Sequence, residues 1–195
     1  MIIGVPREIM PDEGRVALLP QQVRELIQQK RFQVMVEAGA GVKSLATDSE
    51  YTAAGAAVIH DVKELYAKCR TIVKVKEPQY NPEVGAHEVD LMNSGTILIT
   101  FIHPAAPENH SLVRSLSERG ITAFTMDGIP RISRAQSMDA LSSMSTIAGY
   151  KAVITAANIL PRFVPMMTTA AGMIPPAKFL VIGVGVVGLQ AIATA

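Results

Sequence analysis

Short apolar runs alternate with amphipathic segments along the first part of the chain. The apolar runs predict strands at residues 2–5, 34–37, 71–75, 96–102 and 121–125. Between them, apolar residues recur at a spacing near 3.6, which predicts helices at residues 20–29, 62–68 and 108–119. Pro20 suits a first helical turn, and Gly120 suits a helix end. This alternation is typical of crossover units around a largely parallel sheet, so it predicts an α/β fold.

A long helical pattern follows at residues 139–160, and an apolar run at 179–182 predicts a strand that opens a second domain. Asp139, near the start of the helix, would complement the helix dipole. Adjacent side chains on a helix diverge by about 100 degrees, so Tyr150 and Lys151 cannot face one substrate atom. We expect Tyr150 to pack against the protein and Lys151 to face solvent.

Directly after the run at 179–182 comes Gly183-Val184-Gly185-Val186-Val187-Gly188, the spacing of a dinucleotide-binding turn. In such a turn the first glycine permits a tight bend, the second lets the backbone approach a pyrophosphate, and the third packs helix on strand. The spacing alone is a weak signal, and a glycine-rich turn without a ligand is the alternative. A complete unit also needs an acidic residue about 20 positions further on. Since the chain ends at Ala195, we expect it to hold only part of such a site.

Composition narrows the class of protein. The 195 residues are 49 % hydrophobic, which is ample for a buried core, and the net charge of +1 suggests a small-molecule ligand rather than nucleic acid or an acidic membrane surface. One cysteine and four scattered histidines give no disulfide and no metal-ligand spacing. Charges and prolines interrupt each window of about 20 residues that could span a bilayer, and no signal peptide is evident. We expect a cytoplasmic protein with no metal and no membrane span.

Three charged or titratable residues follow predicted strands, where ligands bind in open parallel sheets. Arg15 could pair with a carboxylate, Lys76 could polarise a carbonyl, and His103 could exchange protons near neutral pH. If the strands are neighbours, the three side chains could surround one cleft. The alternative is that each of them is simply a solvated or hydrogen-bonded residue.

The segment at residues 130–143 is more specific, because it gathers polar side chains between a strand and a helix. It contains Arg131, Ser133, Arg134, Gln136, Asp139 and Ser142. Arginine suits a phosphate or carboxamide oxygen, glutamine and aspartate can orient an amide, and serines can cap a helix or meet a ligand. A capped, solvated loop between domains is the alternative.

Several motifs together resemble the alanine dehydrogenase and nicotinamide nucleotide transhydrogenase family. They are Gly14-Arg15-Val16-Ala17, Glu37-Ala38-Gly39-Ala40-Gly41, Lys74-Val75-Lys76-Glu77-Pro78, residues 130–143, Ala148-Gly149-Tyr150, and Thr168-Thr169-Ala170-Ala171-Gly172 leading through Pro175-Pro176-Ala177 to Gly183. The resemblance covers essentially the whole chain. The stretch from Arg131 to Asp139 is similar to the proton-translocating transhydrogenase alpha subunits of the family, and alanine dehydrogenases carry a different sequence there.

This resemblance implies a Rossmann-like N-terminal domain at residues 1–138, a connecting long helix and loop at 139–176, and the start of an NAD-binding Rossmann domain at 177–195. It implies an NAD(H)-binding component that passes a hydride to NADP(H) on a partner domain, while a membrane component moves protons. Arg131, Gln136, Asp139 and Ser142 match the family's nicotinamide-contacting loop and helix start, and Gln136 would lie closest to the partner's nucleotide. The cofactor-binding set implied is Arg131, Ser133, Arg134, Gln136, Asp139, Ser142, Gly183, Gly185, Val186 and Gly188.

The resemblance further implies a homodimer when the subunit is complete, attached to the cytoplasmic face of the inner membrane through its partners. Family members continue well beyond the length of this chain, so we expect an incomplete subunit that is inactive alone. Two other functions remain open. Lys76 and His103 also match the substrate lysine and catalytic histidine of alanine dehydrogenases, and with Arg15 they are compatible with oxidative deamination of alanine. The third hypothesis is a non-catalytic truncated module.

Overall fold

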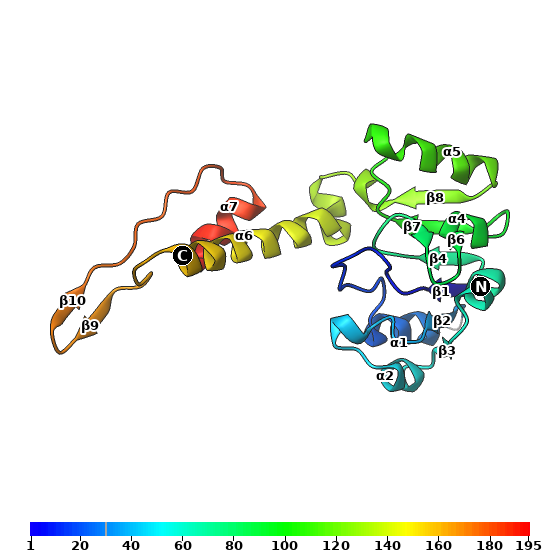
Figure 1. The fold of residues 1–195 in the computed structure, drawn as a ribbon, viewed down its shortest axis with the longest axis horizontal. Helices are drawn as coiled ribbons and strands as arrows, with labels where there is room; N and C mark the ends of the chain where they lie inside the picture. Colours follow the sequence, from blue (N-terminus) through cyan, green and yellow to red (C-terminus); the bar gives the residue numbers. More distant parts are fainter. Residues whose placement is uncertain (30) are drawn as a thin grey trace. The chain divides into compact units, whose positions relative to one another are not determined.

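The computed structural model describes residues 1–29 and 31–195, which form two compact units, Met1–Gly128 and Ile129–Ala195 (Figure 1). The first unit contains the parallel sheet, and the second contains the long helix and the glycine turn. The division into segments 1–138, 139–176 and 177–195 stays a prediction.

The first unit is built on a parallel sheet in the strand order β3-β2-β1-β4-β7-β8. Its strands are β1 (Ile2–Val5), β2 (Gln33–Glu37), β3 (Ala57–Ile59), β4 (Thr71–Val73), β7 (Ile97–Thr100) and β8 (Thr122–Thr125). Every pair of neighbours runs parallel, so the strands wind outward in both directions from β1 and β4. This is the Rossmann order, and it confirms the predicted fold class. The sequence pattern missed β3, a three-residue edge strand with no buried residue.

Short helices connect the strands. They are α1 (Pro20–Gln28), α2 (Asp48–Ala53), α3 (Val62–Lys68), α4 (Glu88–Leu91) and α5 (His110–Glu118), and a small antiparallel hairpin joins β5 (Tyr80–Asn81) to β6 (Ala86–His87). The helices predicted at 20–29, 62–68 and 108–119 are therefore confirmed within a residue or two. The pattern missed α2, although Thr47 and Glu50 form a capping box there, with Thr47 N donating to Glu50 Oε2 at 2.7 Å.

Apolar side chains cover both faces of the sheet. Along β2, Val34 and Val36 join a buried cluster with residues of α1 and α2, whereas Met35 packs against a second cluster that includes residues of α3, α4 and α5. Alternate residues of a strand point to opposite faces, so this split shows that the sheet is buried on both sides. Continuous apolar strands such as β7 are the sequence signal of that arrangement.

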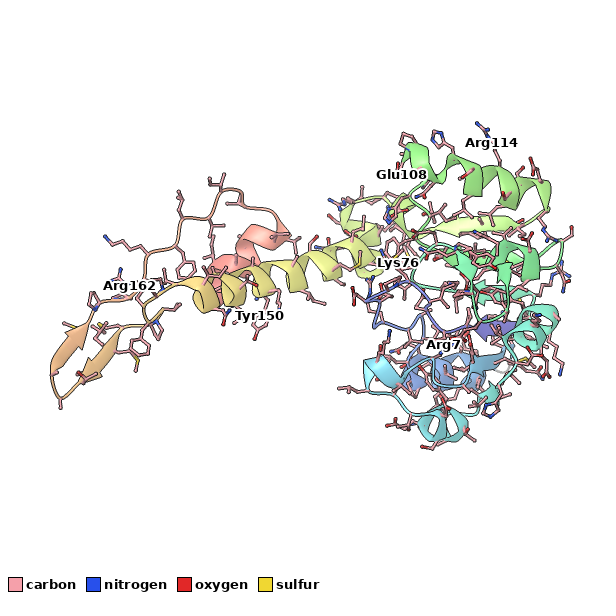
Figure 2. All side chains as sticks on the ribbon, in the orientation of Figure 1. Arg7, Lys76, Glu108, Arg114, Tyr150 and Arg162 are labelled. Atoms are coloured by element: carbon pink, nitrogen blue, oxygen red, sulfur yellow. The ribbon has the colours of Figure 1, made fainter. Side chains whose placement is uncertain are left out.

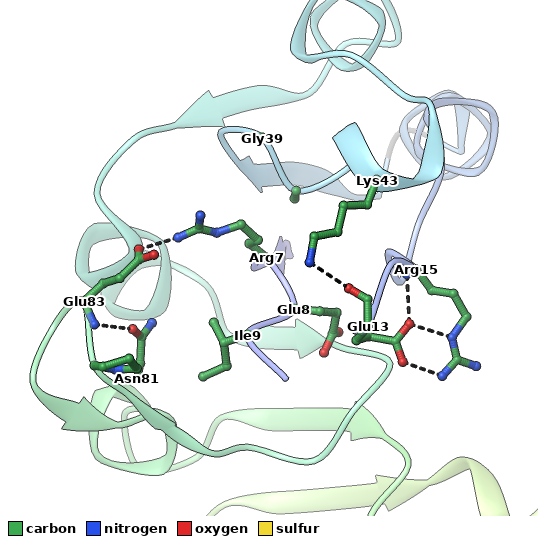
Figure 3. Close-up of a pocket in the computed structure, with 11 residues that line it drawn as sticks. Arg7, Glu8, Ile9, Glu13, Arg15, Gly39, Lys43, Asn81 and Glu83 are labelled. Carbon is green, nitrogen blue, oxygen red and sulfur yellow. Dashed lines mark hydrogen bonds and ion pairs between the residues drawn. The ribbon is translucent and has the colours of Figure 1, made fainter. Parts of the chain in front are cut away.

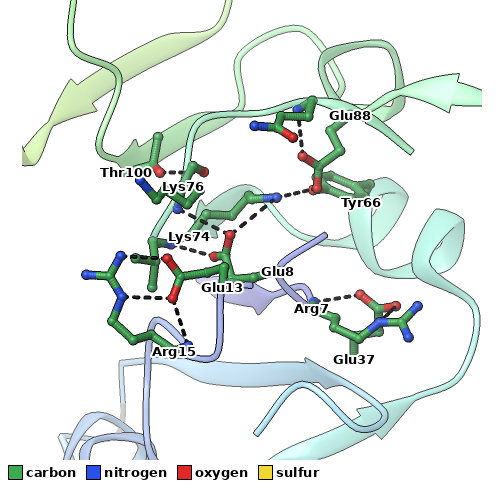
Figure 4. Close-up of polar contacts among 12 residues, drawn as sticks. Arg7, Glu8, Glu13, Arg15, Glu37, Tyr66, Lys74, Lys76, Glu88 and Thr100 are labelled. Carbon is green, nitrogen blue, oxygen red and sulfur yellow. Dashed lines mark hydrogen bonds and ion pairs between the residues drawn. The ribbon is translucent and has the colours of Figure 1, made fainter. Parts of the chain in front are cut away.

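A buried ion cluster joins the chain after β1 to the chain after β4 (Figure 4). The Lys74 side chain is 1 % exposed and forms ion pairs with Glu88 and, at 3.9 Å, with Glu8. Tyr66 Oη donates a hydrogen bond to Glu88 Oε1 at 2.8 Å, and the backbone N–H of Gln79 donates to Oε2 at 2.9 Å. Burial, and then the Glu88 carboxylate, raise the pKa of Tyr66 well above its ordinary value, so Tyr66 stays a donor.

Glu8 extends this cluster to the backbone of the neighbouring strand. It accepts hydrogen bonds from the N–H groups of Val75 at 2.6 Å and Lys76 at 3.2 Å. Burial raises the pKa of Glu8, against the opposing influence of the Lys74 ammonium. The segment just beyond β4 is therefore held by Glu8 in addition to its backbone hydrogen bonds with the chain at β7.

The second unit contains α6 (Ala140–Ile159), α7 (Val186–Thr194) and a hairpin of β9 (Met167–Thr169) and β10 (Gly172–Ile174). The 3-10 helix η4 (Ser133–Met138) precedes α6. The long helix predicted at 139–160 is confirmed. Asp139 lies at its start, as expected, and caps it by accepting from Ser142 N at 3.1 Å. Among the described residues no helix is long and apolar enough to cross a membrane.

Two predictions for the second unit are wrong. Residues 179–182 form no strand, and Leu180 and Ile182 are 88 % and 91 % exposed. A strand needs a hydrogen-bonded neighbour, and no described strand pairs with this segment. Tyr150 does not pack but is 52 % exposed (Figure 2), because Gly149 and Val153 occupy the buried face of α6. Lys151 is exposed, as predicted.

We expect Lys74→Met to destabilise the first unit by about 3–5 kcal/mol, because Glu88 and Glu8 would remain as buried carboxylates without their cation. The free energy of unfolding from urea titrations measures this. The matched control is Lys68→Met, which removes an exposed partner of Glu64 and should cost less than about 1 kcal/mol. Equal losses of unfolding free energy in the two variants would contradict a structural role for the cluster. The double variant Lys74→Met/Glu88→Gln should recover part of the stability, because one unpaired carboxylate is removed.

Candidate functional site

A cavity of about 570 Å³ lies in the second unit, between α6, the segment 179–183 and the start of α7. This volume is in the range of small-molecule sites, and none of its lining residues is acidic. Arg131, Ser142 and Ser145 supply the polar side chains of its wall. The site therefore combines one cation and two hydroxyls with a largely apolar surface.

The glycine turn forms part of this wall, and its glycines have distinct roles. Gly183 has a φ of +105°, a conformation that side chains rarely adopt. A Cβ on Gly188 would lie 2.0 Å from the Gly183 carbonyl oxygen, so only glycine permits this close packing. Gly185 is the N-cap of α7 and has no neighbouring atom within 4 Å of a Cβ position. The backbone at Gly185 is thus open to a ligand.

These features fit the pyrophosphate of a dinucleotide. The first N–H groups of a helix have no partner inside the helix, and its dipole favours an anion there. Val186, the first residue of α7, lines the cavity together with Gly183, Gly185 and Gly188. The bend, the open backbone and the close packing that such a turn requires are all present.

Beside the turn, Asp139 and Ser142 lock the start of α6. Ser142 Oγ donates to Asp139 Oδ2 at 2.6 Å, in addition to the backbone bond of the cap. These hydrogen bonds, and then the nearby Arg131 guanidinium, lower the pKa of Asp139. Asp139 therefore stays an acceptor, and it places Ser142 at the cavity.

The predicted cofactor residues separate into two groups. Arg131, Ser142, Gly183, Gly185, Val186 and Gly188 line the cavity. Ser133, Arg134, Gln136 and Asp139 are not among its lining residues. Ser133, Arg134 and Gln136 lie exposed on η4, and Asp139 is buried at the cap. Sequence reasoning missed Ser145, one turn after Ser142 on the same face of α6, which helical spacing could have indicated.

The first unit has a smaller cavity, of about 210 Å³, at the carboxyl ends of β1 and β2 (Figure 3). Arg7, Arg15 and Lys43 line it together with Glu8, Glu13 and Glu83. Arg7 forms an ion pair with Glu83, and Lys43 Nζ donates to the Glu13 carbonyl oxygen at 3.3 Å. Cations and carboxylates are balanced in this wall, so it has no net preference for an anion.

Arg15 is held by Glu13 through three hydrogen bonds. Its backbone N, Nε and Nη2 donate to the carboxylate at 2.9, 2.8 and 2.6 Å. The side-chain bonds from Arg15, and more weakly the charge of Lys76, lower the pKa of Glu13 to about 2. Two of the three residues predicted to share a cleft therefore act on one carboxylate. Sequence reasoning missed Glu13, although it precedes Arg15 by two residues in the same loop.

His103 lies apart from the Glu13–Arg15 pair and contacts Asp127. Its Nδ1 is 2.9 Å from Asp127 Oδ1, and its ring stacks on Phe101 at 5.9 Å between centroids. Lys76 and His103 are not among the lining residues of the cavity that Arg15 lines. The structure thus pairs Arg15 with Glu13, whose carboxylate also lies within the electrostatic influence of Lys76, and it pairs His103 with Asp127.

Comparison with known proteins shows the family to which the chain belongs. The family described as alanine dehydrogenase/PNT, N-terminal domain, matches residues 4–148, and its C-terminal domain matches residues 152–195. The first part of the NAD(P) transhydrogenase subunit alpha of Rhodospirillum rubrum is 48 % identical over all 195 residues, which correspond to 50 % of that protein. The transhydrogenase subunit alpha of Haemophilus influenzae is 43 % identical over the whole chain, or 36 % of its own length.

Alanine dehydrogenases match at lower identity. The enzyme of Methanococcus maripaludis is 35 % identical over 98 % of this chain and 49 % of its own length. The chain thus spans about half the length, or less, of these curated relatives.

Solved structures agree with the sequence relatives. A transhydrogenase from Sinorhizobium meliloti superposes with a TM-score of 0.90 at 42 % identity, covering all of this chain and 55 % of that one. An L-alanine dehydrogenase gives 0.80 at 33 % identity, covering 99 % of this chain and 51 % of that one. The resemblance inferred from the motifs is confirmed, and the chain belongs to the alanine dehydrogenase/PNT family.

Proposed function

We propose that this chain is part of the NAD(H)-binding component of a proton-translocating NAD(P) transhydrogenase. The observation that carries the proposal is the cavity at which the glycine turn, the start of α7 and Arg131 meet. The relatives support the proposal, because the Rhodospirillum rubrum protein, which is 48 % identical to this chain, is named a transhydrogenase alpha subunit. The proposed partners are an NADP(H)-binding domain, a membrane component and a second copy of the subunit, at the cytoplasmic face of the membrane.

When bound, NADH supplies the hydride that passes to NADP⁺ on the partner domain. Transfer between two nicotinamide rings needs no acid or base from the protein, only two rings held in contact with water excluded. Arg131 and Ser142 would hold polar groups of the dinucleotide, and Gly183, Gly185 and Gly188 would bind its pyrophosphate. Gln136, exposed on η4, would face the nucleotide of the partner.

The proposal is tested with the subunit that carries this sequence, mixed with its NADP(H)-binding component. We expect Arg131→Ala to lower the rate of hydride transfer from NADH to an NADP⁺ analogue about 10- to 100-fold, because a charged hydrogen bond to the dinucleotide is lost. The control is Lys151→Ala, an exposed α6 residue that does not line the cavity. No transfer in the wild type, or equal rates for Arg131→Ala and wild type, would overturn the proposal.

Two glycine substitutions separate folding of the turn from ligand binding. In Gly188→Ala the new Cβ collides with the Gly183 carbonyl, so we expect lower helicity at α7 and weaker NADH binding. In Gly185→Ala the Cβ has space in the protein, so the fold should persist while NADH binding weakens about tenfold or more, because the methyl group blocks approach to the backbone. Circular dichroism and NADH fluorescence titration measure the two effects. Unchanged NADH affinity in Gly185→Ala would exclude the turn as the pyrophosphate site.

A second function is favoured by Arg15, which pairs with Glu13, and by Lys76, whose charge also lowers the pKa of Glu13; Arg15 and Lys76 follow the neighbouring strands β1 and β4. This is the topological switch point of the sheet, where small ligands bind in doubly wound folds. Alanine dehydrogenases are among the relatives. Arg15 would have to exchange its bonds to Glu13 for a substrate carboxylate. NADH formation from alanine that disappears in His103→Ala would support this function, and its absence in the wild type would exclude it.

The Glu13–Arg15 pair also predicts a pH dependence of stability. Since the folded pKa of Glu13 is about 2, below its ordinary 4.5, its contribution is present above 4.5 and is lost as the pH falls towards 2. We expect about 1–2 kcal/mol, less than the full shift implies, because Arg15 is 44 % exposed and water screens the pair. Urea midpoints across this window should fall less steeply in Glu13→Gln than in the wild type, whereas Glu118→Gln, exposed on α5, should behave as the wild type does.

A further inference from the structure

The smaller cavity, in the first unit, is not used by hydride transfer between two nicotinamide rings. Its volume of about 210 Å³ equals the share of about seven waters in the liquid, so it suits a ligand much smaller than a nucleotide. The alanine function would use Arg15, Lys76 and His103, and of these only Arg15 lines the cavity. Because Glu13 already holds the Arg15 side chain, the other polar groups of the wall decide what the cavity can bind.

Asn81, the last residue of β5, is a buried amide in this wall, at 2 % exposure. Its Oδ1 accepts a hydrogen bond from the backbone N of Glu83 at 3.0 Å (Figure 3). A backbone N–H can only donate, so this bond fixes which end of the amide is the oxygen. Nδ2 then carries two protons and makes no hydrogen bond with the described residues. Since buried amides are normally hydrogen-bonded, this group is a donor available to a ligand.

Glu83 provides an acceptor two residues further along the same turn. Its Oε2 forms the ion pair with Arg7, whereas Oε1 accepts no hydrogen bond from the part of the chain that the structure describes. Asn81 and Glu83 both line the cavity, on either side of Pro82. The turn between β5 and β6 therefore presents a donor and an acceptor within two residues of each other.

Lys43, in the 3-10 helix η1 (Val42–Ser44), adds a second donor to the wall. Its Nζ donates to the Glu13 carbonyl oxygen at 3.3 Å, and it forms no ion pair with a described carboxylate. An ammonium has three protons, so two remain for a ligand. The other two cations of the wall, Arg7 and Arg15, are already paired with carboxylates.

These groups favour an uncharged ligand that both donates and accepts hydrogen bonds. A carboxylate ligand would add a charge to a wall whose cations and carboxylates are balanced, and a zwitterion would have to lose the hydration of two charges. A primary carboxamide has a carbonyl acceptor and two N–H donors on one planar group. Ile9 and Pro82, which also line the cavity, would contact a short apolar stem.

We propose that this cavity binds a small, uncharged primary carboxamide. Its carbonyl oxygen accepts from Asn81 Nδ2, with Lys43 Nζ as a second donor, and its NH₂ group donates to Glu83 Oε1. This site goes beyond the proposed transhydrogenase function, and it does not depend on that function or on alanine oxidation.

The experiment titrates the ¹⁵N-labelled 195-residue chain with propionamide. Two-dimensional ¹H–¹⁵N spectra show the side-chain NH₂ of Asn81, which is assigned by its loss in Asn81→Asp. We expect this signal to shift saturably, with a dissociation constant on the order of 1–10 mM for a ligand of so few non-hydrogen atoms. Propionate, which has nearly the same shape, and alanine should bind at least about tenfold more weakly, because their charges must be desolvated.

Asn81→Asp tests the donor itself. The substitution keeps an oxygen for the backbone N of Glu83 and replaces only the NH₂ group. The affinity for propionamide, measured in this variant from the backbone signal of Glu83, should fall at least about tenfold, because a hydrogen bond is lost and a carboxylate oxygen faces the carbonyl oxygen. The matched control is Asn93→Asp, an exposed residue of the first unit that does not line the cavity, and it should leave the affinity unchanged.

Three results would overturn the proposal. The first is a wild-type Asn81 signal that does not shift saturably with propionamide, which can be observed even if Asn81→Asp fails to fold. The second is binding of propionate or alanine as tight as that of propionamide. The third is a folded Asn81→Asp variant that keeps the wild-type affinity for propionamide.

Discussion

The buried ion cluster at Lys74 is the constraint on which the first unit depends. Its one ammonium serves two carboxylates, from the loop after β1 and from the start of α4. Because each of these charges would be costly alone, the segments that carry them are positioned together. Glu8 then helps to fix the backbone at Val75 and Lys76, so the position of Lys76 depends on the cluster as well as on its pairing with the chain at β7.

The sequence predicted the parallel sheet because its central strands are continuous apolar runs, and such runs report burial on both faces. It did not reveal β3, a run of three apolar residues whose pairing with β2 comes from tertiary contact. At residues 179–182 the sequence predicted a strand that the structure does not form. These residues have the composition of a buried strand, but strand formation requires hydrogen-bonded neighbours, which composition cannot report.

The sequence indicated single residues of the candidate sites, but it did not indicate which side chains lie next to them in the folded chain. Glycine spacing located the turn at α7, because steric limits on the backbone are written directly in the sequence. The partners of Arg15 and His103 could not be found in the same way. Glu13 is local but its carboxylate could have pointed elsewhere, and Asp127 is 24 residues from His103, so only the folded chain brings them together.

The strand order of the first unit has a consequence for assigning ligands by fold. It is the order of dinucleotide-binding proteins, yet the segment after β1 is Pro6-Arg7-Glu8, with side chains already engaged in fixed ion pairs where a bare backbone would be needed. The glycine turn occurs instead at the start of α7. The architecture and the turn that we propose for phosphate binding therefore lie in different parts of this chain, and a nucleotide assigned from topology alone would be docked onto a salt-bridged surface.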